Sequence, residues 1–237
     1  MTTTDIETIL TELDAIIDDA SYHRHSFVNA VVSGRVPGDN LAAWGVQKYH
    51  QTCQQNRAFS AIHSRCPHLD VRQYEMSQLI GEETAIADGT EAHYNLMKRF
   101  AVAMGCPEDL GGVGPAPAVQ SFIDYIVGTC QREHFVLRML AFYVNERQTP
   151  AAVQRLRDYL VGERGLSERD VEWFDVHGDL DTEHANLARA LIARYAHEVS
   201  DFDVRSRQLV ARGCEEWTKL QDFYYEVVMA GVEEPAR

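Results

Sequence analysis

Apolar residues recur at helical spacing along almost the whole chain. The segment IETILTELDAIIDDA places isoleucine and leucine at intervals of three and four residues, the spacing of one helix face. After the breaker PGDN, the segment DNLAAWGVQKYHQTCQQNRAFSAIHSRC predicts a second, long helix capped by Asp39 or Asn40. The period-two alternation that marks a half-buried strand is almost absent. The pattern therefore predicts an all-α protein.

Glycine, proline and capping residues divide the rest of the chain into further helices. A helix over residues 118–146 is expected to be interrupted near Gly128. Thr149 is expected to cap a helix that has Pro150 at its first position, and Ser167 to cap another. The other expected helices span residues 68–87, 91–105, 177–198 and 203–231. With a loop of about ten residues at GCPEDLGGVGPAPA, they form an irregular bundle of seven or more helices in a single domain, residues 1–237.

Composition excludes several classes of function. A formal net charge of −14 argues against a nucleic-acid partner, because phosphate binding needs clustered lysine and arginine. No apolar run reaches about 18 residues, so no membrane span is expected. The acidic, amphipathic amino terminus does not have the character of a secretory signal. Five cysteines without a CxxC pair suit reduced thiols. We therefore expect a cytoplasmic protein.

The stretch HGDLDTEH concentrates ionisable side chains on one helix stripe. His177, Asp181 and His184 follow one another at intervals of four and three residues. The same stripe continues as Ala188 and Leu191, which favour burial. Such a motif alone is often an ordinary helix surface. Its continuation into an apolar face indicates buried groups that need partners.

Two other segments supply candidate partners. Glu146 continues the apolar face of HFVLRMLAFYVNERQTP, although it could instead lie in solvent at the end of that helix. Glu82 and His93 are eleven residues apart, a spacing that returns a continuous helix to nearly the same direction. If the helix breaks near Gly89, Glu83 becomes an alternative to Glu82.

These residues make up a set of three carboxylates and three imidazoles: Glu82, His93, Glu146, His177, Asp181 and His184. Helical bundles that hold two iron or manganese ions use inward-facing carboxylates and histidines of this kind. Oxygen and nitrogen donors suit divalent iron or manganese better than a thiolate-bound metal. Two divalent cations would largely compensate three buried carboxylates.

The chain resembles the haem-oxygenase-like diiron oxidases, a branch of the fold shared with the pyrroloquinoline-quinone synthase and thiaminase II groups. The resemblance rests on SAIHSRCPHLDVRQ followed by LIGEE, and on HYNLMKRFAVAMG, LAFYVNERQTP and WFDVHGDLDTEHANLARALI. It implies a haem-oxygenase-like fold and a pair of Fe(II) ions, or Mn, with O2 as co-substrate. The family ligands fall on the same six residues. The resemblance further implies oxidation of a small substrate, here expected to be an amino acid or related carboxylic acid, by desaturation, cleavage or cyclisation.

Some members of the family are thought to consume one of their own tyrosines. The matching stretch here is HSFV, with Val28 in place of that tyrosine, and Leu156 replaces a lysine of those members. A self-consuming reaction is therefore not expected. Two alternatives stay open: a metal-independent thiaminase-like hydrolase with a cysteine nucleophile, and a non-catalytic helical interaction module. A homodimer is expected.

Overall fold

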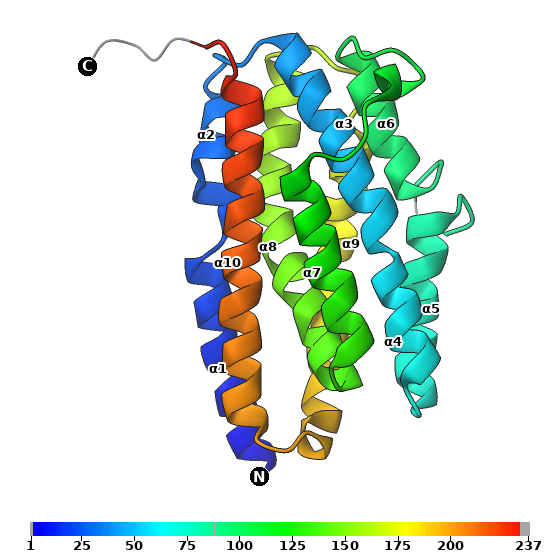
Figure 1. Cartoon of the computed structure of the whole chain (residues 1–237), viewed down its shortest axis with the longest axis vertical. Helices are drawn as coiled ribbons and strands as arrows, with labels where there is room; N and C mark the ends of the chain where they lie inside the picture. The colour runs from blue at the N-terminus through cyan, green and yellow to red at the C-terminus, as the bar shows by residue number, and fades with distance from the viewer. Residues whose placement is uncertain (1, 88, 233–237) are drawn as a thin grey trace.

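The protein folds into an elongated bundle of helices that lie side by side (Figure 1). This computed structural model describes residues 2–87 and 89–232, with the side chains of all of these except 179–181. The α-helices are α1 (Thr3–Asp19), α2 (Ser26–Val32), α3 (Gly38–Gln55), α4 (Arg57–Arg65), α5 (Leu69–Glu83), α6 (His93–Ala103), α7 (Pro117–Arg132), α8 (Phe135–Gly162), α9 (Glu172–Tyr195) and α10 (Phe202–Met229). Short 3₁₀ turns cover Tyr22–Arg24, Leu110–Gly112 and Ala196–Glu198. No strand occurs in the described residues, so the all-α prediction is confirmed.

Two of the expected helix boundaries are wrong because local geometry overrides the pattern. The long helix predicted after PGDN breaks at Asn56, where the amide of Phe59 bonds the Asn56 carbonyl three residues back and tightens the turn. Gly128 does not interrupt its helix, since α7 continues to Arg132. The break comes at His134, which caps α8 by accepting a hydrogen bond from the amide of Val136.

Pro150 lies inside α8 instead of beginning a new helix. The helix continues from Phe135 to Gly162, and the Thr149 hydroxyl donates to the carbonyl of Asn145 rather than capping a helix start. Proline has no N–H, so the carbonyl of Glu146, four residues back, loses its helical donor. Glu146 therefore lies in mid-helix. Its exposure of 4% shows that the solvent-exposed alternative was wrong.

The start of α9 also differs from the prediction. Ser167 and Asp170 exchange the expected hydrogen bonds, from each backbone amide to the other side chain at 3.3 Å. These bonds close a turn before the helix instead of its first turn, because α9 begins at Glu172. His177 therefore lies more than a turn inside the helix, where the backbone fixes its direction.

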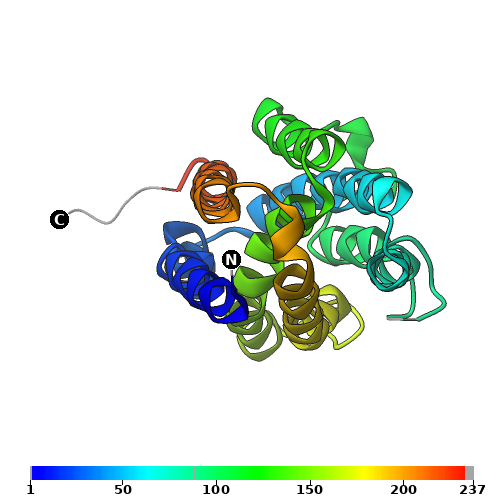
Figure 2. The ribbon, with the colours of Figure 1, turned by 90° about the horizontal axis from the view of Figure 1, so that it is seen from below.

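The first part of α8 lies inside the bundle, with neighbouring helices around it in the end-on view of Figure 2. Every residue from Phe135 to Val144 is buried, so this part of the helix is covered on all sides, whereas Ala151, Gln154 and Asp158 further along are exposed. It packs against α9, α10, α7 and α2. The hydrophobic core extends from Ile6 in α1 to Val228 in α10. Among the described residues no helix is long and apolar enough to cross a membrane. All five cysteines are free thiols; Cys66, Cys130 and Cys214 are buried, as the sequence suggested, whereas Cys53 and Cys106 are half-buried.

A glycine allows α3 and α6 to approach closely. A Cβ atom added at Gly45 would lie 2.9 Å from the Cβ and 3.1 Å from the Cα of Ala101. Real Cβ atoms essentially never approach another atom to 2.9 Å, and the alanine Cβ cannot move aside without its backbone, so the two helices would have to separate. Because α6 carries His93 at its first residue, this contact also fixes the position of that histidine.

We predict that Gly45→Ala lowers the free energy of unfolding by about 1–3 kcal/mol through overpacking, although alanine favours a helix. Gly162→Ala is the matched control, since this helical glycine has no atom within 4 Å of its added Cβ. The control should leave stability unchanged or raise it by up to about 1 kcal/mol. Urea unfolding of both variants measures the difference. Equal stability of the two variants would contradict the close packing.

Candidate metal centre

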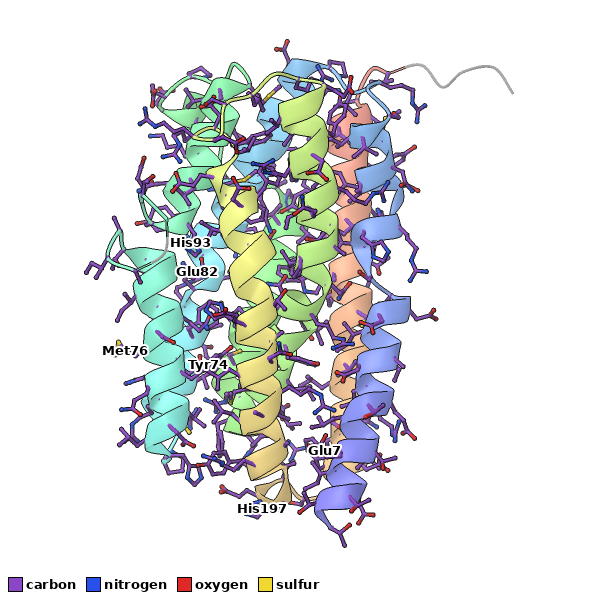
Figure 3. All side chains as sticks on the ribbon, turned by 180° about the vertical axis from the view of Figure 1, so that it is seen from behind. Glu7, Tyr74, Met76, Glu82, His93 and His197 are labelled. Atoms are coloured by element: carbon purple, nitrogen blue, oxygen red, sulfur yellow. The ribbon has the colours of Figure 1, made fainter. Side chains whose placement is uncertain are left out.

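Three of the expected residues converge inside the bundle. Ligating atoms of Glu82, His93 and His177 all lie within 4.8 Å of one another. The Oε1 atom of Glu82 lies 3.2 Å from His93 Nδ1 and 3.6 Å from His177 Nε2. Figure 3 shows Glu82 and His93 together at one end of α5, while Met76 points away from the bundle. One carboxylate thus faces two imidazoles from different helices.

Glu82 and His93 meet for a reason other than the one the sequence suggested. They do not share a helix, because α5 ends at Glu83 and α6 begins at His93. The eleven-residue spacing argument was therefore wrong. The end of α5 lies beside the start of α6, so the last turn of α5 is next to the first residue of α6 (Figure 3). Glu83 is exposed, so Glu82 is the acidic residue that contacts both histidines.

A hydrogen bond fixes the ring of His177. Its Nδ1–H donates to the carbonyl of Trp173 at 2.8 Å, one helical turn earlier. The ring also stacks on the indole of Trp173, with centroids 4.1 Å apart. In this tautomer Nε2 carries the lone pair and faces Glu82. Burial lowers the pKa of His177 and so favours the neutral form that binds metals.

Glu146 approaches the same place from α8 and is held by a tyrosine. The hydroxyl of Tyr74 lies 3.2 and 3.3 Å from the two carboxylate oxygens of Glu146 and can donate to either. The same hydroxyl is 3.5 Å from the backbone carbonyl of His184. Burial raises the pKa of Glu146 to about 8; the Tyr74 hydrogen bond opposes this shift, and the charge of Glu82 adds to it.

The remaining two expected residues lie further along α9. The side chain of Asp181 lies outside the described residues. His184 is half-buried, and its side chain is not in the group of three that lies within 4.8 Å. Four of the six expected residues are thus placed together: Glu82, His93 and His177 in direct contact, with Glu146 on the same small cavity.

The donor set fits a divalent cation. The Oε2 atom of Glu82 is buried and has no hydrogen-bond partner among the described residues. Burial by itself would raise the pKa of Glu82. The charge of His93, together with the contacts that His177 and His93 make with the carboxylate, outweighs burial and holds that pKa well below its ordinary value. A metal ion that receives lone pairs from these groups would supply the same stabilisation without protons on the histidines. Oxygen and nitrogen ligands suit iron or manganese.

Sequence reasoning missed several residues around the site. The cavity is lined by Lys48, Thr52, Gln55, Phe59, Gln78, Glu82, Phe142, Asn145, Glu146, Thr149, Trp173 and His177. Helical spacing could have identified two of these, because Gln78 precedes Glu82 by four residues and Trp173 precedes His177 by four. Glu75, a further turn back on α5, is buried to 1% exposure. Burial, followed by the charge of Glu146, raises its pKa well above the ordinary value.

No cysteine lines this cavity in the part of the chain that the structure describes. Burial raises the pKa of every one of the five thiols. A nucleophilic cysteine needs a lowered pKa and an adjacent base. The site therefore offers no support for the cysteine hydrolase considered from the sequence.

Solved structures with the same fold come from several bacteria. A protein with a heme oxygenase-like fold from Shewanella denitrificans matches at a TM-score of 0.67 and 16% identity, covering 100% of this chain and 99% of that one. A TenA homologue from Pseudomonas syringae pv. tomato matches at a TM-score of 0.74 and 13% identity, covering 94% of each chain. At these identities the likeness shows the fold, which is haem-oxygenase-like as predicted.

Curated relatives share more sequence. The 4-aminobenzoate synthase of Chlamydia muridarum is 28% identical over 194 residues, which is 81% of this chain and 80% of the relative. The 4-aminobenzoate synthase of Nitrosomonas europaea is 25% identical over 229 residues, 91% of this chain and 90% of the relative.

The sequence profile of one family, described as iron-containing redox enzymes, matches residues 42–218. This range begins in α3, ends in α10 and contains every residue of the cluster and cavity described above. The chain is a member of the iron-containing redox enzyme family with a haem-oxygenase-like fold.

Proposed function

We propose that this protein is an O2-dependent diiron oxidase that oxidises a small amino acid or related carboxylic acid. The observation that carries the proposal is the contact between Glu82, His93 and His177 within 4.8 Å in the interior of the bundle. Glu146 faces the same cavity. We propose that this group would hold one iron ion and that Glu146, Asp181 and His184 would complete the ligand set for two ions.

The type of substrate oxidation follows from the number of electrons that the reduction of O2 requires. Reduction of O2 to two water molecules needs four electrons and four protons. Two hydrogen atoms of the substrate would supply two of each, iron held by these residues would supply the other two electrons, and solvent the other two protons. Turnover would then require an external one-electron reductant. Removal of two hydrogens corresponds to desaturation or ring closure of the substrate; carbon–carbon cleavage can follow the same first C–H abstraction.

The side chains of this protein hold and shield the site. The carbonyl of Trp173 orients His177 so that Nε2 faces the cavity. The hydroxyl of Tyr74 holds the carboxylate of Glu146. Phe59, Phe142 and the Trp173 ring form apolar walls that exclude water and strengthen the electrostatic interactions inside.

An external substrate is favoured over a residue of the chain itself. The relatives are named for synthesis of 4-aminobenzoate, an aromatic carboxylic acid, which supports a substrate or product of this chemical class. Val28 and Leu156, the residues that replace the tyrosine and lysine discussed above, are both buried aliphatic side chains. Neither can serve as a phenol or amine donor. The homodimer stays a prediction.

Anaerobic titration with Fe(II) should reach about two ions per chain. Glu82→Gln should lose at least one of them, because an amide oxygen is a much weaker ligand than a carboxylate. Glu83→Gln is the matched control, since this neighbouring glutamate is exposed, and it should load like the unmodified protein. Iron analysis after desalting gives the stoichiometry. No bound iron in the unmodified protein, or full loading of Glu82→Gln, would refute the assignment.

The contribution of Glu146 to the stability of the metal-free protein should fall as the pH rises from about 5 to about 8. Glu146 has an ordinary pKa of 4.5 and a folded value of about 8, so the folded chain binds this proton more tightly than the unfolded chain. Its contribution is fully present below the ordinary pKa and is lost as the pH rises through about 8. The expected slope is up to about 1.4 kcal/mol per pH unit for each such proton.

Thermal melting of metal-free protein across this pH range measures the effect. Glu146→Gln, which resembles the protonated acid, should show a shallower fall, while Glu83→Gln should keep the original slope. Fe(II) loading should reverse the fall, because the cation stabilises the ionised carboxylate. An identical slope for Glu146→Gln and the unmodified protein would show that the carboxyl is not held protonated.

Some amino acid or aryl carboxylic acid should accelerate O2 consumption by the Fe(II)-loaded protein at least about tenfold over the substrate-free rate, a difference of about 1.4 kcal/mol in barrier. A screen of such acids with an oxygen electrode measures this. Glu82→Gln should remove the acceleration, and Glu83→Gln should retain it. Equal acceleration in Glu82→Gln would mean that free iron, and not the site, causes the oxidation.

A further inference from the structure

The cavity beside the candidate metal centre contains a second group of polar side chains that metal binding does not use. Lys48 and Thr52 reach it from successive turns of α3, Gln78 from α5 and Trp173 from α9. All four are buried, with exposures between 1% and 8%. A side chain that loses water on folding must find another partner, or its burial costs free energy.

Three of these residues have polar atoms with unmet hydrogen-bonding capacity. The hydroxyl of Thr52, the amide nitrogen of Gln78 and the indole nitrogen of Trp173 are buried without a hydrogen-bond partner among the described residues. The amide and indole nitrogens can only donate, and the hydroxyl can donate as well. The complementary ligand is therefore an acceptor.

A lysine places positive charge at the same location. The ammonium of Lys48 donates to Gln51 Oε1 at 3.1 Å and lies over the indole of Trp173, 4.9 Å from the ring centroid. Gln51 also accepts a hydrogen bond from Tyr224, at 2.8 Å, so the position of the lysine is fixed by a buried network. Lys48 is the only lysine or arginine among the described residues that line the cavity.

We propose that Lys48, Thr52, Gln78 and Trp173 bind the carboxylate of the substrate; this proposal rests on the proposed function. Three neutral donors and one ammonium match an anion with several acceptor lone pairs, and charge-assisted hydrogen bonds of this type are strong. The acidic residues of the cavity, Glu82 and Glu146, would repel such an anion and belong to the metal ions instead. Phe59 and Phe142 provide apolar contacts for the rest of the molecule.

The test uses pairs of simple probes that differ only in the charged group: acetate with acetamide, and benzoate with benzamide. Isothermal titration calorimetry on anaerobic Fe(II)-loaded protein should show each acid binding at least about tenfold more tightly than its amide. Lys48→Met should weaken acid binding at least about tenfold and leave amide binding unchanged. Thr52→Val, which removes a donor that an amide carbonyl can also use, should weaken acid binding at least about tenfold and amide binding less. Lys98→Met, a lysine of α6 outside the cavity, is the matched control and should bind both probes like the unmodified protein.

The isosteric Thr52→Val variant separates this site from direct coordination of the acid by iron, which that substitution would not affect. Unchanged acid affinity in Thr52→Val and Lys48→Met, or equal affinity for acid and amide, would overturn the proposal. Iron stoichiometry and far-UV circular dichroism of each variant are measured alongside. Absence of bound iron would refute the proposed function, whereas full iron loading without acid selectivity would refute only the carboxylate site.

Discussion

The burial of acidic side chains in a helical core is the constraint on which the structure of this protein depends. Glu75, Glu82 and Glu146 lie in the interior of the bundle, where an ionised carboxylate is expensive unless a cation or a proton compensates it. The pKa values of Glu75 and Glu146 are raised, which means that these two groups hold protons when no metal is bound. Glu82 stays ionised because two histidines face it. The same interior can therefore exist in a protonated form and, as we propose, in a form in which cations replace the protons.

The helices make this arrangement possible because they fix each side chain before any ligand arrives. Glu146 projects from α8, whose first ten residues are all buried and cannot shift without disturbing the core. His177 is held by the carbonyl of Trp173 within its own helix. His93 begins α6, which the Gly45 contact presses against α3. Binding of a metal ion by these side chains loses less conformational entropy because folding has already fixed the helices that carry them.

The sequence predicts the fold well and the site in part, for different physical reasons. The spacing of apolar residues reflects which helix face is buried, so it predicts where the helices lie. The residues at which helices end depend on tertiary contacts, which the spacing does not show. Pro150 suggests a helix boundary in the sequence but lies inside α8. The helices packed around α8 keep it continuous although the backbone hydrogen bond to the carbonyl of Glu146 is missing. Residues on one helix, such as His177 and Asp181, can be related by spacing. Glu82 and His93 meet across a turn between two helices, and Lys48 and Gln78 come from helices far apart in the chain, so no local spacing relates them.

The polar donors around the cavity bear on whether the oxidised group comes from solution or from the chain itself. A protein that oxidises one of its own residues needs no means to bind a free acid, because the peptide chain already holds the reacting group. This chain has aliphatic Val28 and Leu156 at the positions that the resemblance associates with an internal donor. It has instead an ammonium and unmet N–H and O–H groups on the cavity wall. Buried donors without partners cost stability unless a ligand satisfies them, and an acid that enters from solution, as we propose, would do so.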